Sequence, residues 1–337
     1  MIISGLLCGI LLGFVMQRGR FCITGAFRDI YLTKNSKMFI AFLIIIAVQA
    51  VGVLSLQEAG ILAPKVKNFA LIATLIGAFL FGVGIVLAGG CSAGSLYRAG
   101  EGLVSSWIAF FVYMIFSAIF RAGPMQDFTK SLRSITVEQQ TIYNTFGVSP
   151  WVLVVILVLV TAFLAFCSQA KSKHNVAQLK PKKTGLAHIL FEKRWHPFVS
   201  ASLIGVIAVL AWVTSVQTGR NGGLGITGPT VQALQYVTTG DSNFINWGTL
   251  LILGILIGGF IAAKFSNEFK LRVPTSQDVV HNVMGGALMG IGASLAGGCS
   301  IGNGLVETAL FSWQGWVALP LMVLGTWASA HYLYMRN

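Results

Sequence analysis

The feature that most constrains the fold of this chain is a series of nine long apolar runs. A helix needs about 20 mostly apolar residues to cross the hydrocarbon core of a bilayer. In lipid the backbone must satisfy its own hydrogen bonds, so spanning runs of this kind form helices. The sequence therefore predicts an all-α polytopic membrane protein with about nine transmembrane helices. The runs cover residues 2–17, 38–57, 69–88, 103–120, 150–168, 197–216, 245–264, 279–298 and 315–334.

The composition excludes soluble, disordered and nucleic-acid-binding proteins. Of the 337 residues, 55% are hydrophobic and 10% are charged, whereas a soluble domain has about 25% charged residues. The net charge of +13 lies in the gaps between apolar runs, so it indicates membrane topology rather than a basic face for nucleic acid. The five cysteines form no CxxC pair and the chain has no phosphate-binding loop. We therefore expect no disulfide framework, no metal or other cofactor, and no enzymatic activity.

Basic residues are unequally divided between alternate loops. If the N-terminus lies outside, 17 of the Lys and Arg residues fall on the cytoplasmic side and 6 on the opposite side. The positive-inside rule therefore predicts an outside N-terminus and a cytoplasmic C-terminus. The Lys-rich stretch at residues 169–196 is then a cytoplasmic linker.

An internal repeat divides the chain into two halves, residues 1–168 and 197–337. Residues 77–94 match residues 285–302 at eleven of eighteen positions, including the block AGGCS in both copies. A weaker similarity relates residues 17–25 to residues 217–228, where Cys22 falls opposite Gly222. Five predicted crossings separate the copies, and because five is odd the copies lie on opposite sides of the membrane. This predicts an inverted-topology repeat, which is typical of transport folds.

Each GGC motif ends an apolar run and precedes a stretch of small polar residues. Glycines permit a sharp break, and irregular backbone is tolerated at membrane depth only when it is buried in protein or lines a cavity. We therefore expect two re-entrant loops or short helices that aim backbone N–H groups at the membrane centre, which suits an anion. The residues expected along the path are Cys22, Cys91, Cys299, Arg20, Gly90, Ser92, Gly298, Ser300 and Asn303.

Acidic residues are absent from the interior of the predicted helices. All ten lie at helix ends or in loops, whereas proton relays and cation sites usually place carboxylates inside the membrane. The remaining candidate is a path lined by thiols, hydroxyls and amides with basic mouths.

The GRFC segment at residues 19–22, the paired GGC motifs and the order of the elements resemble the YeeE/YedE family of bacterial inner-membrane proteins. The resemblance implies import of thiosulfate from the periplasm, with Cys22, Cys91 and Cys299 matching the family's pore cysteines. It also implies cooperation with a small cytoplasmic sulfur-carrier protein of the YeeD/TusA type. The apolar runs predict membrane lipid as the surroundings of the helices, and the basic residues predict a periplasmic N-terminus. Gly222, where strict symmetry would place a cysteine, agrees with three pore thiols.

Thiosulfate suits such a path because a neutral S–H is a weak donor that can hold the ion without trapping it. Three other functions stay open at this point: transport of another small sulfur or selenium anion, thiol oxidation coupled to a quinone, and a structural role in a larger complex. Cys8 and Cys167 lie inside apolar runs and are interpreted as packing residues. Gly5, Gly9 and Gly13, spaced by four residues, predict close packing of the first helix.

Overall fold

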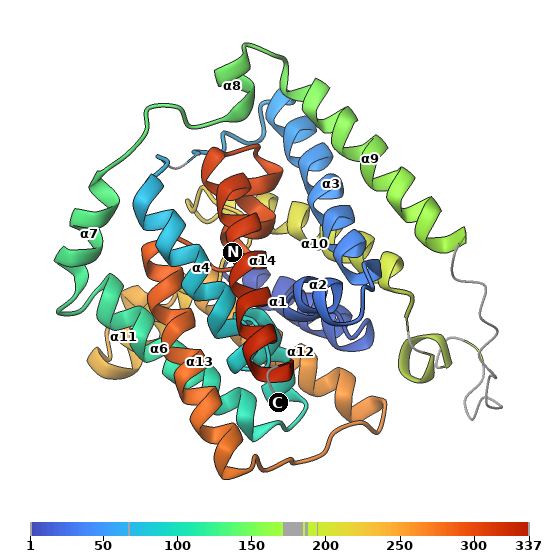
Figure 1. The fold of residues 1–337 in the computed structure, drawn as a ribbon, viewed down its shortest axis with the longest axis vertical. Coiled ribbons are helices and arrows are strands. Elements are labelled where there is room, and N and C mark those ends of the chain that lie inside the picture. Colours follow the sequence, from blue (N-terminus) through green and yellow to red (C-terminus); the bar gives the residue numbers. More distant parts are fainter. Residues whose placement is uncertain (1, 67, 171–184, 186–187, 194, 336–337) are drawn as a thin grey trace.

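The computed structural model describes residues 2–66, 68–170, 185, 188–193 and 195–335, which fold into a bundle of helices (Figure 1). The helices are α1 (Ile3–Arg18), α2 (Ile23–Leu32), α3 (Lys37–Glu58), α4 (Leu71–Leu87), α5 (Ser92–Gly100), α6 (Val104–Arg121), α7 (Gln126–Ser134), α8 (Ile142–Phe146), α9 (Pro150–Ala170), η1 (His188–Glu192), α10 (Pro197–Val216), α11 (Thr227–Thr239), η2 (Ser242–Phe244), α12 (Trp247–Phe265), α13 (Ser276–Leu295), η3 (Gly302–Glu307) and α14 (Trp313–Tyr334). The prediction of an all-α polytopic membrane protein is confirmed.

The nine apolar runs correspond to α1, α3, α4, α6, α9, α10, α12, α13 and α14. Within the described ranges, seven segments are long and apolar enough to span a membrane, and two of these, Ile3–Leu32 and Leu71–Gly100, include the short helix that follows the long one. The other two long helices, α13 and α14, contain polar side chains such as His281 and Gln314. Both pack against α4, so neighbouring helices rather than lipid cover part of their surface.

Helix contacts follow the exchange pattern that a two-fold repeat requires. Helix α1 packs on α12 while α3 packs on α10, and α4 packs on α14 while α6 packs on α13. In the same way α2 packs on α14 while α11 packs on α6. The two halves correspond helix by helix: α1, α2, α3, α4 and α6 of the first half match α10, α11, α12, α13 and α14 of the second. Replacing each helix by its counterpart converts the first contact of every pair above into the second. The two halves are therefore interleaved and share one core.

Helices α4 and α13 each end just before a GGC motif and pack antiparallel to each other. A Cβ atom on Gly84 would lie 2.7 Å from the backbone nitrogen of Met289, and one on Gly292 would lie 2.5 Å from that of Phe81. Residues 81 and 84 match 289 and 292 at the repeat offset of 208, so both helices make the same contact. Antiparallel packing of two equivalent helices agrees with an inverted repeat.

Glycines bring α1 into backbone contact with α12. A Cβ atom on Gly5 would lie 3.0 Å from the carbonyl carbon of Trp247, and one on Gly13 would lie 2.9 Å from the Cα atom of Ile255. The contacts progress in the same direction along both helices, so α1 and α12 run parallel. The prediction of close packing at the four-residue glycine spacing is confirmed.

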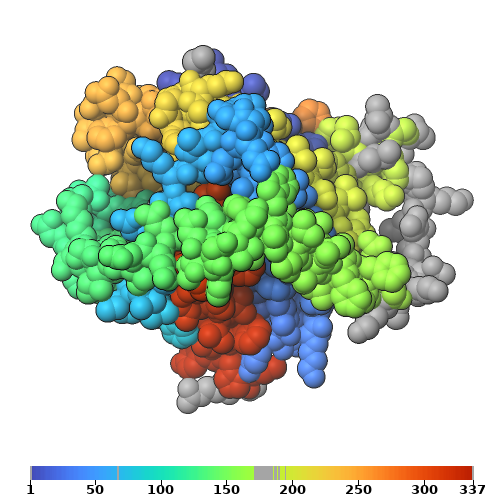
Figure 2. Space-filling model, turned by 90° about the horizontal axis from the view of Figure 1, so that it is seen from above, coloured from blue at the N-terminus to red at the C-terminus, as the bar shows by residue number. Residues whose placement is uncertain are grey.

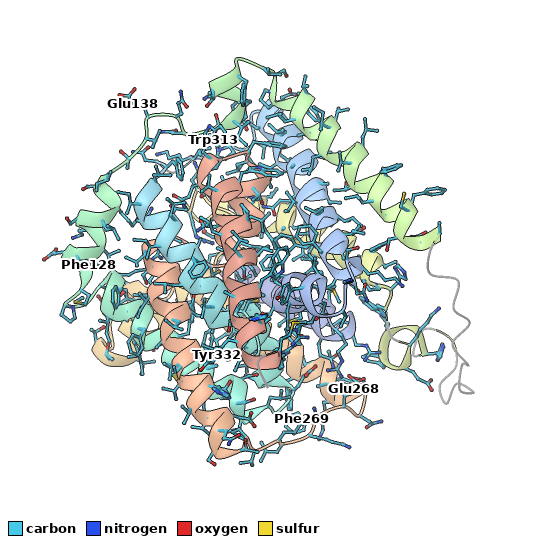
Figure 3. All side chains as sticks on the ribbon, viewed as in Figure 1. Phe128, Glu138, Glu268, Phe269, Trp313 and Tyr332 are labelled. Carbon is cyan, nitrogen blue, oxygen red and sulfur yellow. The ribbon has the colours of Figure 1, made fainter. Side chains whose placement is uncertain are left out.

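The connecting segments gather at two opposite ends of the bundle. Arg20, after α1, is bonded to Glu268, after α12, and we call this the inner end. Thr141, before α8, is bridged to Ser312, before α14, and we call this the outer end. Glu268 and Trp313 mark these two ends in Figure 3. The names follow the orientation that the basic residues predict.

Helices α7, α8 and α9 run along the outside of the bundle and connect the two halves. Figure 2 shows this green segment crossing one face of the molecule. Helix α9 packs on α3 and leaves most of its apolar surface exposed, as expected of a helix that faces lipid. Most of the predicted linker at residues 169–196 lies outside the described residues.

Candidate functional site

Three buried cysteines lie where long helices break. Cys22 and Cys91 are the N-cap residues of α2 and α5, and each sulfur accepts a hydrogen bond at 3.4 Å from a backbone N–H, that of Gly25 or Gly94. Cys299 lies between α13 and η3. The exposed fractions of the three side chains are 8%, 0% and 1%. The helix breaks predicted at these motifs are therefore present.

Cys91 lies within electrostatic range of both of the other cysteines, and the side chain of Ser300 is its hydrogen-bonding neighbour. Cys22 and Cys91 belong to the first half of the chain, and Cys299 belongs to the second. The fold thus assembles one group of thiols from both halves. We call Cys22, Cys91 and Cys299 the thiol cluster.

An arginine holds each GGC loop at the same carbonyl group. Gly89 and Gly297 precede the two Gly-Cys pairs and adopt left-handed backbone angles, with φ of 66° and 74°. Arg98 donates to the carbonyl oxygen of Gly89, and Arg121 donates to that of Gly297 at 3.2 Å. Arg98 comes from α5 and Arg121 from the end of α6, so non-equivalent residues support equivalent turns.

Gly298 and Asn303 determine the shape of the second loop. The amide nitrogen of Asn303 donates to the carbonyl oxygens of Ala296 at 2.8 Å and Gly298 at 3.1 Å, and its oxygen accepts from Gln314 at 2.9 Å. A Cβ atom on Gly298 would lie 2.9 Å from that amide oxygen. The side chain of Asn303 thus stabilises the loop through hydrogen bonds. The matching Gly90 of the first loop is also buried.

Two serine hydroxyls beside the thiol cluster have unused hydrogen-bonding capacity. Ser92 and Ser300 are fully buried, and their polar neighbours are Tyr113 and Cys91, although neither Oγ atom makes a hydrogen bond of normal geometry within the described residues. Ser92 lies near Tyr113, whose hydroxyl donates to Thr227 at 2.8 Å. Buried polar groups are nearly always satisfied by protein, water or ligand. The two serines are therefore suited to bind the oxygen atoms of an anion.

A cavity of about 280 Å³ at the outer end reaches the thiol cluster at Cys299. Lys65, Arg121 and Arg220 line it together with one carboxylate, that of Glu307. Burial lowers the pKa of Arg220 from its ordinary value, but a guanidinium remains charged in proteins. An excess of positive charge in a cleft attracts anions.

A second cavity, of about 330 Å³, lies at the inner end and is lined by Arg18, Arg20, Glu192 and Glu268. Arg20, expected from the sequence at a basic mouth, is paired here with Glu101 at 3.0 Å and Glu268 at 2.7 Å. The inner mouth therefore differs from the outer one, because carboxylates neutralise its arginine.

Sequence reasoning did not single out Arg121, Arg220 or Tyr113 for the site. Arg121 and Arg220 entered only the count of loop charges. A signal for Arg220 was present, since it aligns with Arg20 in the weaker repeat. Tyr113 carries no comparable signal because it is one aromatic residue within an apolar run.

The sequence was also compared with those of known proteins. Residues 18–328 match the family described as "Sulphur transport". The chain is 54% identical over 336 residues to the thiosulfate transporter TsuA of Escherichia coli. The aligned region covers 100% of this chain and 96% of that protein. It is 33% identical to TsuA of Spirochaeta thermophila over 100% of both chains. A probable transporter, YedE of Salmonella typhimurium, is 36% identical over 53% of this chain and 43% of its own length.

Proposed function

Because the chain belongs to the sulphur transport family, we propose that it imports thiosulfate across the bacterial inner membrane along a path formed by the thiol cluster. One observation carries the path: three buried thiols from both halves lie together, and one of them, Cys299, lines a cationic outer cavity. The protein acts as a transporter rather than as an enzyme.

Capture begins in the outer cavity. Lys65, Arg121 and Arg220 attract the dianion, and low-dielectric walls strengthen this attraction relative to water. The sulfate-like oxygens of thiosulfate match guanidinium and ammonium donors. The terminal sulfur then faces Cys299 at the floor of the cavity.

Passage through the centre depends on weak contacts. From Cys299, which lines the outer cavity, the ion moves to Cys91 and then to Cys22, which follows Arg20 of the inner cavity. The S–H groups meet the soft sulfur of the ion, while Ser92 and Ser300 supply hydroxyls for its oxygens. Several weak sites in series let an ion enter and also leave.

The outer end is assigned to the periplasm and the inner end to the cytoplasm. This assignment is supported by the 17 basic residues on the predicted cytoplasmic side against 6 on the other. The N-terminus is then periplasmic and the C-terminus cytoplasmic.

A small cytoplasmic sulfur-carrier protein of the YeeD/TusA type receives the ion at the inner end. The family resemblance supports this partner. Co-purification of such a carrier with the transporter, tested with and without thiosulfate, is the corresponding measurement.

Uptake by purified protein in liposomes tests the proposed function. We expect saturable uptake of labelled thiosulfate, little uptake of sulfate, and no loss of uptake in a mild reductant. Selenate and selenosulfate serve as competitors that separate thiosulfate from selenium anions. Absence of thiosulfate uptake, or uptake that requires reoxidation of a cysteine pair, would contradict the proposal, and the second result would favour a thiol oxidoreductase.

A further inference from the structure

Three connecting segments are tied together at the inner end by one arginine. Arg20 Nη1 donates to Glu101 Oε1 at 3.0 Å and Arg20 Nη2 donates to Glu268 Oε2 at 2.7 Å. Arg20 precedes α2, Glu101 follows α5, and Glu268 follows α12. The ion pairs therefore connect both halves of the repeat. We call Arg20, Glu101 and Glu268 the inner latch.

The surroundings of the inner latch add further bonds. Gln17 Nε2 donates to Glu268 at 2.7 Å, and Arg18 lies 3.6 Å from the same carboxylate. Arg20 itself adopts a left-handed backbone angle, with φ of 48°, which is costly for a residue with a long side chain. The strained turn is thus held where its side chain meets both carboxylates.

The inner latch holds the turn that leads into Cys22 of the thiol cluster. Cys22 is two residues after Arg20 and is 8% exposed. Glu101 is 5% exposed and follows the C-terminal end of α5, whose opposite end is capped by Cys91. Any separation of these segments therefore changes access to Cys22 from the inner end.

The equivalent arginine at the outer end is not neutralised. Arg220 aligns with Arg20, yet it interacts with no carboxylate among the described residues. Its guanidinium lies over the ring of Trp247, 5.2 Å from the centroid, and its Nη1 atom has no hydrogen-bond partner in the described part of the chain. One arginine of the repeat thus faces an open cavity while its equivalent is bound by two carboxylates.

We propose that the inner latch is a gate, which the transported anion opens by competing with Glu101 and Glu268 for Arg20. This inference rests on the proposed function. The two carboxylates occupy Arg20 as an anion would, so a dianion arriving at Cys22 takes over the arginine and frees the segments after α5 and α12. The Arg20 and Glu268 side chains are 38% and 37% exposed, so this pair is partly solvated and weak enough to exchange, whereas Glu101 is buried and is the stronger of the two attachments. The gate responds to the ion itself and needs no other signal.

Reactivity of Cys22 toward N-ethylmaleimide measures the gate without measuring transport. The purified full-length protein is labelled in detergent, and peptide mass spectrometry gives the rate at each cysteine. The variants are Glu268→Gln and Glu101→Gln/Glu268→Gln, which remove charge and keep shape. Asp29→Asn is the matched control, because Asp29 pairs with Arg28 near the same end and outside the inner latch.

We expect the double variant to label Cys22 about tenfold faster than the unmodified protein, which corresponds to about 1.4 kcal/mol in the population of the open gate. Glu268→Gln alone should give a smaller increase, and Asp29→Asn should give none. Cys299 lines the outer cavity, so its rate should stay constant and serves as the internal reference.

An unchanged Cys22 rate in a monodisperse double variant would overturn the gate. Failure of the proposed function is separate, since it would appear as missing thiosulfate uptake by the unmodified protein while the labelling result is unaffected.

Discussion

Valine substitutions at Gly84 and Gly292 test whether the central α4–α13 contact positions the thiol cluster. Added Cβ atoms would lie 2.7 Å and 2.5 Å from backbone nitrogen atoms, which is 0.7 Å and 0.9 Å closer than the 3.4 Å at which ordinary contact begins. The obstructing atoms are backbone and cannot rotate away, so the helices must separate by most of 1 Å. Overpacking of this kind costs about 1–3 kcal/mol. Alanine would regain about 1 kcal/mol through its helix propensity, so valine is the cleaner choice.

The assay is the temperature at which half of the purified protein loses monodispersity, combined with thiosulfate uptake. Both variants should melt earlier, by similar amounts because the two contacts are equivalent, and both should lose uptake because the loops with Cys91 and Cys299 directly follow α4 and α13. Leu75→Val is the control, since that side chain of α4 is 39% exposed. Melting temperatures and uptake equal to those of the control in both glycine variants would refute the reasoning.

Three further predictions concern capture, loop shape and orientation. Arg220→Gln should raise the KM for uptake roughly ten- to hundredfold, because this is the factor that corresponds to the free energy of one hydrogen bond to a charged group. Lys130 is exposed, and Lys130→Gln should leave the KM unchanged. Equal KM values for the two variants would show that Arg220 does not take part in capture. Asn303→Ala removes the side-chain donor to the carbonyl of Gly298, whereas Gln314 and the carbonyl of Ala296 keep their bond to each other. The variant should therefore cost about 1–3 kcal/mol, seen as earlier melting and lost uptake; normal melting would contradict its role in the loop. Reporter fusions between α6 and α9 should be periplasmic and fusions at the C-terminus cytoplasmic, and the opposite result would reverse the path.

The fold could be predicted from sequence where a pattern is local or repeated. Apolar runs fix helices because lipid leaves the backbone no alternative partner. The two copies of LAGGCS mark equivalent helix ends, and an odd number of intervening crossings makes the repeat inverted. Three glycines at a spacing of four residues predict close packing of the first helix, although they do not identify α12 as its partner.

Partners far apart in sequence could not be predicted in this way. Arg20 and Glu268 are separated by 248 residues, and either side chain alone is an ordinary loop charge. The GGC loops are held by Arg98 and by Arg121, which are not equivalent in the repeat, so alignment of the two halves does not find the second from the first. Asn303 was expected in the path because of its position after Cys299, whereas its hydrogen bonds depend on the tertiary approach of Gln314.

Packing and path cysteines can be separated within one chain. Cys8 lies in α1, where its sulfur is 3.7 Å from the hydroxyl of Thr214, and Cys167 lies in the peripheral helix α9. Neither belongs to the thiol cluster. The five cysteines thus provide their own matched controls for the effect of removing a thiol.

Thiosulfate uptake by alanine variants of the five cysteines, measured in liposomes at equal protein content, is the most direct test of the thiol path. Cys22→Ala, Cys91→Ala and Cys299→Ala each remove one donor, and an unmet partner in a buried site costs about 1–3 kcal/mol. Uptake should therefore fall roughly five- to hundredfold if that step limits the rate, with partial recovery in the serine variants, while Cys8→Ala and Cys167→Ala remain active. Full uptake by all three variants of the thiol cluster would contradict the account.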